Sequence, residues 1–310
     1  MKKFGTAIIL LILQSSYGVP AQSPASCRGG IVFDTVFDLT GGGSAEDPVT
    51  PDVWAIRIDG TGIRQLTFAR PGEFSRLANL SPDGQRIVFQ GRREVEGDGL
   101  FVMMCATGQL ARVTAAGTAR PSGPTWSPDG RQIAFVQEGA IFVIRADGSN
   151  VRKIEGLPTP SSGPAWSPDG QQIAFTSMGD LTWEIFAVDL GSGHVRQLTH
   201  TTEPRTSSQA PEWSPDGSKI AFDRTRDGNF DIYVMNSDGT GIVQLTHDPG
   251  DAARPAWSPD GRSIVFHSTG DHRFAGPADF RFLEIYTMRA DGSNLRRLTF
   301  NQHFDAHPDW

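Results

Sequence analysis

The tetrapeptide Ser-Pro-Asp-Gly occurs five times in this sequence of 310 residues, beginning at positions 81, 127, 167, 214 and 258. A tryptophan precedes the last four copies. Counted through Leu80, Trp126, Trp166, Trp213, Trp257 and Trp310, the spacings are 46, 40, 47, 44 and 53 residues. Repeats of about 40–50 residues are typical of the blades of β-propellers. The sequence therefore predicts a ring of similar blades.

Each repeat predicts the same four short strands. Trp166 ends a first strand, and the turn at 167–170 leads to a second strand such as 172–175. Proline sets φ at the second turn position, and glycine relieves crowding at the fourth. A loop then leads to a third strand such as 231–235, and an Asp-Gly hairpin leads to a fourth such as 196–199. We expect each blade to be a four-stranded antiparallel sheet.

The ring is predicted to close by joining the two ends of the chain. The second strand occurs six times, starting at Ile31, Ile87, Ile133, Ile173, Ile220 and Ile264. The sixth first strand ends at Trp310, where no turn follows. Residues 304–310 should therefore complete the N-terminal blade, which leaves no exposed sheet edge. The fold class is all-β, a six-bladed propeller over residues 31–310, with its tryptophans and phenylalanines packed between blades.

The N-terminus predicts a signal peptide over residues 1–21, followed by a short segment at 22–30. Lys2 and Lys3 precede an apolar run at 7–13, and small or compact residues occupy 19–21. The run is shorter than the roughly 20 residues that cross a bilayer, so we expect no transmembrane segment in the mature protein. Export to the periplasm is the predicted localisation.

Cys27 and Cys105 are the only cysteines. They could form a disulfide in an oxidising compartment, although sequence alone does not place their Cα atoms within the roughly 7 Å that this requires. Cys27 could instead be the lipid-bearing cysteine of a lipoprotein. The preceding Pro24-Ala25-Ser26 lacks the usual aliphatic residue, which disfavours that alternative.

Charge and motifs exclude two function classes. The 28 basic and 35 acidic residues give a net charge of −7, and no run of lysines and arginines is present. Nucleic acid is therefore not a predicted partner. No Gly-x-Ser-x-Gly nucleophile elbow occurs, so the sequence predicts no serine peptidase.

Residues 211–246 carry nearly all of a recognisable pattern: Pro-x-Trp-Ser-Pro-Asp-Gly, Ile-Ala-Phe, Asp-Ile-Tyr-Val-Met-Asn-x-Asp-Gly-Thr and Gln-Leu-Thr. This resembles the WD40-like propeller repeat of the TolB family. The resemblance implies a periplasmic, non-catalytic scaffold without a cofactor that contacts envelope proteins. TolB also has an N-terminal α/β domain, whereas only residues 22–30 precede the first strand here. Contacts of that domain are therefore not implied, and a contact with a peptidoglycan-associated lipoprotein stays open.

Loop lengths indicate where a partner could bind. Strand direction puts the loops between second and third strands on the same rim as the loops between blades. Long insertions occur at 38–51, 92–98 and 268–282, in blades that closure makes neighbours. Binding residues often gather on such loops. Insertions that accumulated without a function would produce the same loop lengths. The predicted partner-binding residues are Glu73, Arg76, Arg92, Arg93, Asp271, His272, Arg273, Phe280 and His303.

The histidines suggest an alternative function. His303 and His307 lie on the closing loop between blades, with Asp305 between them, and His200 and His247 occupy corresponding rim positions. Such side chains could form a saccharide or metal site at the channel mouth, including that of a lyase. A His-x-x-x-His pair binds metal chiefly on a helix, so no metal ligand is predicted. The acidic residues at 223–231 resemble a calcium loop but lack the rest of an EF-hand.

Overall fold

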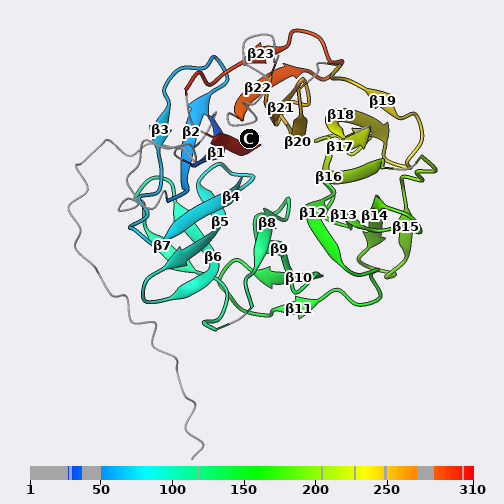
Figure 1. Ribbon diagram of the computed structural model, residues 1–310. Helices are drawn as coiled ribbons and strands as arrows, with labels where there is room; N and C mark the ends of the chain where they lie inside the picture. The colour runs from blue at the N-terminus through cyan, green and yellow to red at the C-terminus, as the bar shows by residue number, and fades with distance from the viewer. Residues whose placement is uncertain are drawn as a thin grey trace, which may run out of the picture.

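The computed structural model describes residues 27, 30–36, 50–117, 119–203, 205–226, 228–247, 250–270, 283–301 and 304–310. Within these residues, 24 strands form six four-stranded sheets. The sheets are arranged in a ring, and we call the centre of this ring the channel (Figure 1). This confirms the predicted six-bladed all-β propeller. The described residues contain no helix that is long and apolar enough to span a membrane. The predicted signal peptide at 1–21 lies outside the described residues.

The blades follow one another along the chain, and their strands run from the channel outward. The first three blades contain β24 (Phe304–Asp309), β1 (Gly30–Val36), β2 (Asp52–Arg57) and β3 (Arg64–Gln65), then β4 (Phe74–Leu80), β5 (Arg86–Arg93), β6 (Gly97–Met104) and β7 (Leu110–Arg112), then β8 (Ser122–Trp126), β9 (Gln132–Gln137), β10 (Ala140–Arg145) and β11 (Arg152–Lys153). The last three contain β12 (Ser161–Trp166), β13 (Gln172–Met178), β14 (Trp183–Asp189) and β15 (Val195–Gln197), then β16 (Ser207–Trp213), β17 (Lys219–Arg226), β18 (Asn229–Asn236) and β19 (Val243–Gln244), then β20 (Ala252–Trp257), β21 (Ser263–Ser268), β22 (Glu284–Arg289) and β23 (Arg296–Arg297).

The first blade contains both ends of the described chain. C-terminal β24 pairs antiparallel with N-terminal β1, with Phe304 opposite Val36 and Asp309 opposite Val32. Figure 1 shows the red β24 beside the blue β1 at the channel. The predicted closure by residues 304–310 is therefore confirmed.

The hydrophobic core consists of layers between adjacent blades. The phenylalanine of each second strand is buried, as at Phe33, Phe89, Phe135, Phe175, Phe222 and Phe266. The four tryptophans that precede the turns are buried as well. Between the second and third blades, for example, Val88 and Leu100 pack with Trp126 and Phe135. These aromatic residues stabilise the ring, as the sequence predicted.

The Ser-Pro-Asp-Gly turns satisfy their own polar groups. In the third blade, Ser127 Oγ donates to Asp129 Oδ1 at 2.6 Å and accepts from Gln132 N–H at 2.9 Å. Asp129 also accepts from the N–H of Arg131 at 3.0 Å. Equivalent Ser–Asp bonds form in the other four turns. This rim, which we call the turn rim, therefore has the same internally bonded motif in each of these blades.

A second repeated bond joins the third and fourth strands. Thr246 Oγ1 accepts from Ile232 N–H at 2.9 Å and donates to Asp231 at 2.8 Å. The other oxygen of Asp231 accepts from Gln244 at 2.9 Å. The same threonine–acid arrangement occurs at Thr67, Thr199 and Thr299. The acid at 231 in the calcium-like sequence therefore has a structural role inside the blade.

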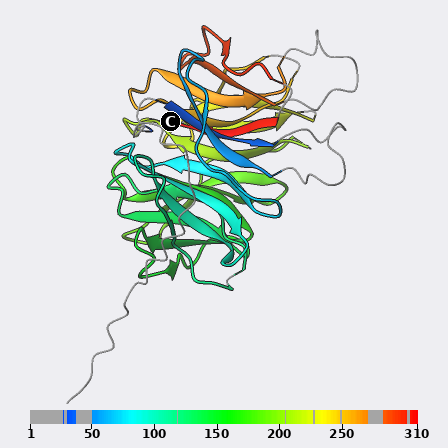
Figure 2. The same ribbon diagram turned by 90° about the vertical axis from the view of Figure 1, so that its left-hand side faces the viewer.

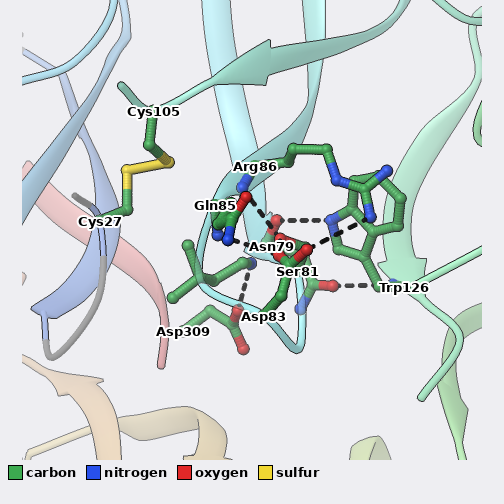
Figure 3. The surroundings of a disulfide bond; sticks show 10 residues. Cys27, Asn79, Ser81, Asp83, Gln85, Arg86, Cys105, Trp126 and Asp309 are labelled. Atoms are coloured by element: carbon green, nitrogen blue, oxygen red, sulfur yellow. Dashed lines mark hydrogen bonds and ion pairs between the residues drawn. A yellow bond between two sulfur atoms is a disulfide. The ribbon is translucent and has the colours of Figure 1, made fainter. Parts of the chain in front are cut away.

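Cys27 and Cys105 form a disulfide, with their Cα atoms 5.6 Å apart (Figure 3). Cys27 precedes β1, whereas Cys105 follows β6 in the next blade. The bond joins two neighbouring blades across 78 residues of sequence. It answers the question of pairing that the sequence left open, and its Sγ atoms are not free for lipid attachment.

Candidate functional site

The strands run between two rims, which Figure 2 shows from the side. The turn rim carries the Ser-Pro-Asp-Gly turns and the hairpins between third and fourth strands. The opposite rim, which we call the loop rim, carries the connections between second and third strands and between blades. Five of the predicted partner-binding residues, Asp271, His272, Arg273, Phe280 and His303, lie outside the described residues. The other four, Glu73, Arg76, Arg92 and Arg93, are described.

These four residues surround Phe74, the first residue of β4. Phe74 lies opposite Arg92 in the register of β4 and β5, and Arg76 lies opposite Gln90. Alternate residues share one face of a strand, so Phe74, Arg76, Gln90 and Arg92 share a face of this sheet. The guanidinium carbons of Arg76 and Arg92 lie 5.1 and 5.9 Å from the Phe74 ring centroid. Both distances are within the range of cation–π attraction.

Arg92 is held by a carboxylate. Its Nε and Nη2 donate to the two oxygens of Asp98 at 2.9 and 3.0 Å. Arg120, from the connection to the third blade, donates to the same carboxylate at 3.1 Å. The hydrogen bond from Arg92 is the main reason why the pKa of Asp98 is lowered. Asp98 therefore fixes two arginines at the rim.

Arg93 has a different environment, because alternation turns it to the opposite face of β5. It donates to the carbonyl of Phe74 at 2.8 Å and to Ser75 Oγ at 2.9 Å. Its guanidinium lies over the rings of Phe89 and Phe101. Burial lowers its pKa, an effect that nearby acids, Glu73 first, oppose. Arg93 fastens β4 to β5 and supports the rim from within.

Glu73 links two loops. Its Oε2 accepts from Arg70 N–H at 3.1 Å, and its Oε1 accepts from Glu94 N–H at 3.0 Å. The first donor belongs to the turn before β4, and the second to the hairpin between β5 and β6. Both carboxylate oxygens are thus used to hold the rim in shape.

A cavity of about 220 Å³ opens beside these residues. Its lining includes Pro51, Glu73, Phe74, Arg76, Gln90 and Arg120. Polar atoms, two guanidinium groups and one aromatic ring therefore meet at one place, which we call the Phe74 cavity. Gln90 is the residue that the sequence reasoning missed, since it occupies a position that belongs to the regular repeat.

The channel wall contains a second set of polar residues, built on a repeated β-bulge. One residue of each innermost strand, three positions before the tryptophan or Leu80, has φ between 49° and 57°. These residues are Leu77, Gly123, Gly163, Ala210, Arg254 and His307. In four of them, Leu77, Ala210, Arg254 and His307, the N–H donates to a side chain of the preceding blade. The acceptor is the residue that directly follows the Ile-x-Phe segment of the second strand in that blade. In this way Asp34 accepts from Leu77 at 3.1 Å, Thr176 from Ala210 at 3.1 Å, and Asp223 from Arg254 at 3.0 Å.

His307 belongs to this bulge series. The sequence interpretation placed it in a loop, which is wrong, because β24 begins at Phe304 and includes it. Its N–H donates to His267 Nδ1 at 3.1 Å, and its Nδ1 lies 3.0 Å from Asp34 Oδ1. Burial lowers the pKa of His267 well below its usual value, which keeps Nδ1 available as an acceptor. No group of three or more His, Cys, Asp or Glu side chains suited to a metal ion occurs among the described residues.

Acids of the channel wall have raised pKa values because they are buried. Burial raises the pKa of Asp223 to about 6 and that of Asp309 to about 7. The pKa of Glu212 is raised well above its usual value, first by burial and then by the charge of Asp309. Asp309 accepts from Leu80 N–H at 2.7 Å, and Asn79 accepts from Trp126 N–H at 2.8 Å (Figure 3). These side chains join consecutive blades.

The raised pKa of Asp309 predicts that Asp309→Asn stabilises the protein at alkaline pH. An unfolded aspartate has a pKa of about 3.9, so the stability that Asp309 contributes is present below that pH and is lost as pH rises through about 7. Asparagine keeps the oxygen acceptor without the charge. The carboxyl is desolvated, but the residue as a whole keeps intermediate exposure. We therefore expect a gain of only roughly 1–2 kcal/mol at about pH 8, and almost none near pH 3.5.

Thermal melts at the two pH values test this expectation. Asp260→Asn is the matched control, because hydrogen bonds from Ser258 and the Arg262 backbone lower the pKa of Asp260. Asp260→Asn should therefore lower the melting temperature at the higher pH, whereas Asp309→Asn should raise it. A destabilised Asp309→Asn protein at about pH 8 would contradict the argument.

Comparison with known proteins places the chain in a family. The profile described as the TolB beta propeller domain matches residues 137–310, more than half of the sequence. The chain belongs to the TolB β-propeller domain family. The match includes the strands from β10 to β24 and the turns that begin at Ser167, Ser214 and Ser258.

Solved structures share the propeller fold. A putative TolB from Agrobacterium tumefaciens is 24% identical with a TM-score of 0.67, over 89% of each chain. TolB from Acinetobacter baumannii is 20% identical with a TM-score of 0.73, over 91% of this chain and 66% of its own. An oligogalacturonate lyase in complex with manganese is 17% identical with a TM-score of 0.52, over 87% of this chain and 72% of its own. At these identities the likeness shows the fold alone.

Proposed function

We propose that this TolB-type propeller is a non-catalytic periplasmic scaffold that binds a protein of the cell envelope on its loop rim, around Phe74. The observation that carries the proposal is the convergence of Phe74, Arg76, Arg92 and Arg120 beside a cavity. Arginine and aromatic residues are enriched among the residues that dominate protein interfaces. A rigid sheet positions these side chains, and rigid elements favour precise binding sites.

Export supports the location of this function. The N-terminal residues read as a signal peptide, and the Cys27–Cys105 disulfide is the kind of bond that persists in an oxidising compartment. Membership of the TolB family agrees with an envelope role. The partner would therefore be met outside the cytoplasm.

The likeness to a manganese-containing lyase suggests a competing function, metal-assisted chemistry at the channel. The described residues do not fit a metal site, since they contain no suitable group of three ligands. The Nδ1 of His267 accepts a backbone N–H, and the Nδ1 of His307 lies against Asp34. Both atoms are already engaged, the first in a bond between the sixth and first blades and the second in a contact within the first blade. The scaffold is therefore the function that we retain.

Photo-crosslinking tests the proposed surface. Val95, in the β5–β6 hairpin beside the cavity, is 95% exposed. A photoreactive phenylalanine analogue at this position should capture one envelope protein in intact cells, and excess unlabelled protein should suppress the product. Exposed loop residues contribute little to the core, so the substitution should leave the fold unchanged.

Two positions serve as controls for that experiment. Leu181 lies on the loop rim of the fourth blade, and Val151 lies on the turn rim; both are exposed. Neither position should give the product obtained from Val95. Equal capture from all three positions, or none from Val95, would refute a partner site around Phe74.

A further inference from the structure

Gln90 differs from the other polar residues at its position in the repeat. Asp34, Thr176, Asp223 and His267 each accept the N–H of a bulge residue in the next blade. Gln90 is equally buried, at 3% exposure, but its Oε1 has no hydrogen-bond partner among the described residues. Buried carbonyl oxygens are normally paired, and an unpaired one calls for an explanation. Gln90 also lines the Phe74 cavity.

Arg76 supplies a positive charge at the same place. It lies opposite Gln90 in the strand register and also lines the cavity. The nearby carboxylates are engaged elsewhere: Asp98 binds two arginines, and Glu73 accepts two backbone N–H groups. Among the described residues, the Arg76 guanidinium contacts the ring of Phe74. Its forked N–H donors match the geometry of a carboxylate.

We propose that the Phe74 cavity binds the side-chain carboxylate of an extended acidic peptide segment, with the carboxylate on Arg76 and a peptide N–H on Gln90 Oε1. The inference rests on the proposed function and names the chemistry of the partner. The volume of about 220 Å³ suits one side chain, since pockets for whole small molecules have roughly 300–1,000 Å³. The Phe74 ring supplies an apolar surface for the methylene groups of a glutamate.

The test uses full-length protein and three probes: the capped peptide acetyl-Ala-Ala-Glu-Ala-Ala-amide, its Glu→Gln counterpart, and acetate. Binding is followed through the NMR signal of the Arg76 side chain and by titration. Because a charge-assisted bond is lost, the Gln peptide should bind about tenfold more weakly than the Glu peptide. Acetate should also bind more weakly, since it has no peptide N–H for Gln90. Equal binding of acetate and the Glu peptide would overturn the proposal.

Variants identify the residues involved. Arg76→Gln should abolish the preference for Glu over Gln, whereas Arg131→Gln, exposed on the turn rim, should leave it unchanged. Gln90→Leu should weaken binding of the Glu peptide. The melting temperature should stay the same or rise, because the substitution removes an unpaired buried carbonyl. If Gln90→Leu lowers the melting temperature and leaves affinity unchanged, Gln90 is structural and the inference is wrong.

The two proposals fail separately. Crosslinking from Val95 without preferential binding of the Glu peptide would overturn the acidic-segment inference and leave the scaffold proposal standing. Preferential binding of the Glu peptide without a crosslinked partner would support the acidic-segment inference and overturn the scaffold proposal. The peptide measurement needs no cellular partner, so its result does not depend on the crosslinking experiment.

Discussion

Deletion of residues 304–310 is expected to open the ring and remove most of the stability of the protein. These residues form β24, which bonds to β1 along its length and closes the first blade. Without these residues, the edge of β1 is exposed, and the apolar layer that contains Ile31 and Phe33 loses its contact with Trp310. Losing the ladder bonds of a strand, at about 0.5–1.5 kcal/mol each, together with an aromatic contact amounts to roughly 5 kcal/mol or more. Ordinary domains have a total stability of about 5–15 kcal/mol.

Thermal and urea denaturation of the truncated protein measure this effect. We expect a much lower or a non-cooperative transition. A synthetic peptide covering residues 301–310, added in excess, should recover part of the stability by occupying the vacant strand position. Trp310→Phe serves as the control, since it keeps most of the apolar contact with the sixth blade. A truncated protein with the full-length melting temperature would show that β24 does not close the ring.

The repeat determined how much of the fold was predictable. Ser-Pro-Asp-Gly turns and Ile-x-Phe strands are local patterns, and each copy reinforces the same register. Six second strands with only five complete first-strand turns left one arrangement for residues 304–310, which β24 adopts. Disulfide pairing was not predictable in this way, since the distance between Cys27 and Cys105 depends on how neighbouring blades pack.

The bulge series was not predictable from residue types. A positive φ usually indicates glycine or asparagine, yet Leu77, Arg254 and His307 adopt it. The blades impose this conformation through a hydrogen bond between neighbours, which no sequence window contains.

The sequence predicted the rim on which the candidate site residues lie, but it did not predict the contacts between them. Strand direction placed Glu73, Arg76, Arg92 and Arg93 on one rim, and the structure brings the four together around Phe74. Alternation along β5 separates Arg92 from Arg93, so that one faces the cavity side and the other supports the sheet. Gln90 escaped notice because its neighbours belong to the most regular part of the repeat.

Reduction of the Cys27–Cys105 disulfide is expected to destabilise the propeller strongly without unfolding it at room temperature. The bond closes a loop of 78 residues, and in the chain-entropy account a loop of this length corresponds to roughly 4–5 kcal/mol. It also ties Cys27, which packs with Val32 and Val53 of the first blade, to Cys105 of the second blade. At about 2–4 °C per kcal/mol for a large domain, the melting temperature should fall by about 10 °C or more.

Melts with and without reductant, followed by circular dichroism, measure this shift. The reduced wild-type protein keeps both side chains in the core, so it isolates the covalent bond from any change in packing. Cys27→Ala/Cys105→Ala should melt at or below the temperature of the reduced protein and show no further response to reductant. Since the bond and β24 both fix the first blade, reduction should lower the stability of the truncated protein further than that of the full chain. An unchanged melting temperature on reduction would mean that the remaining contacts of the first blade already hold Cys27 and Cys105 together.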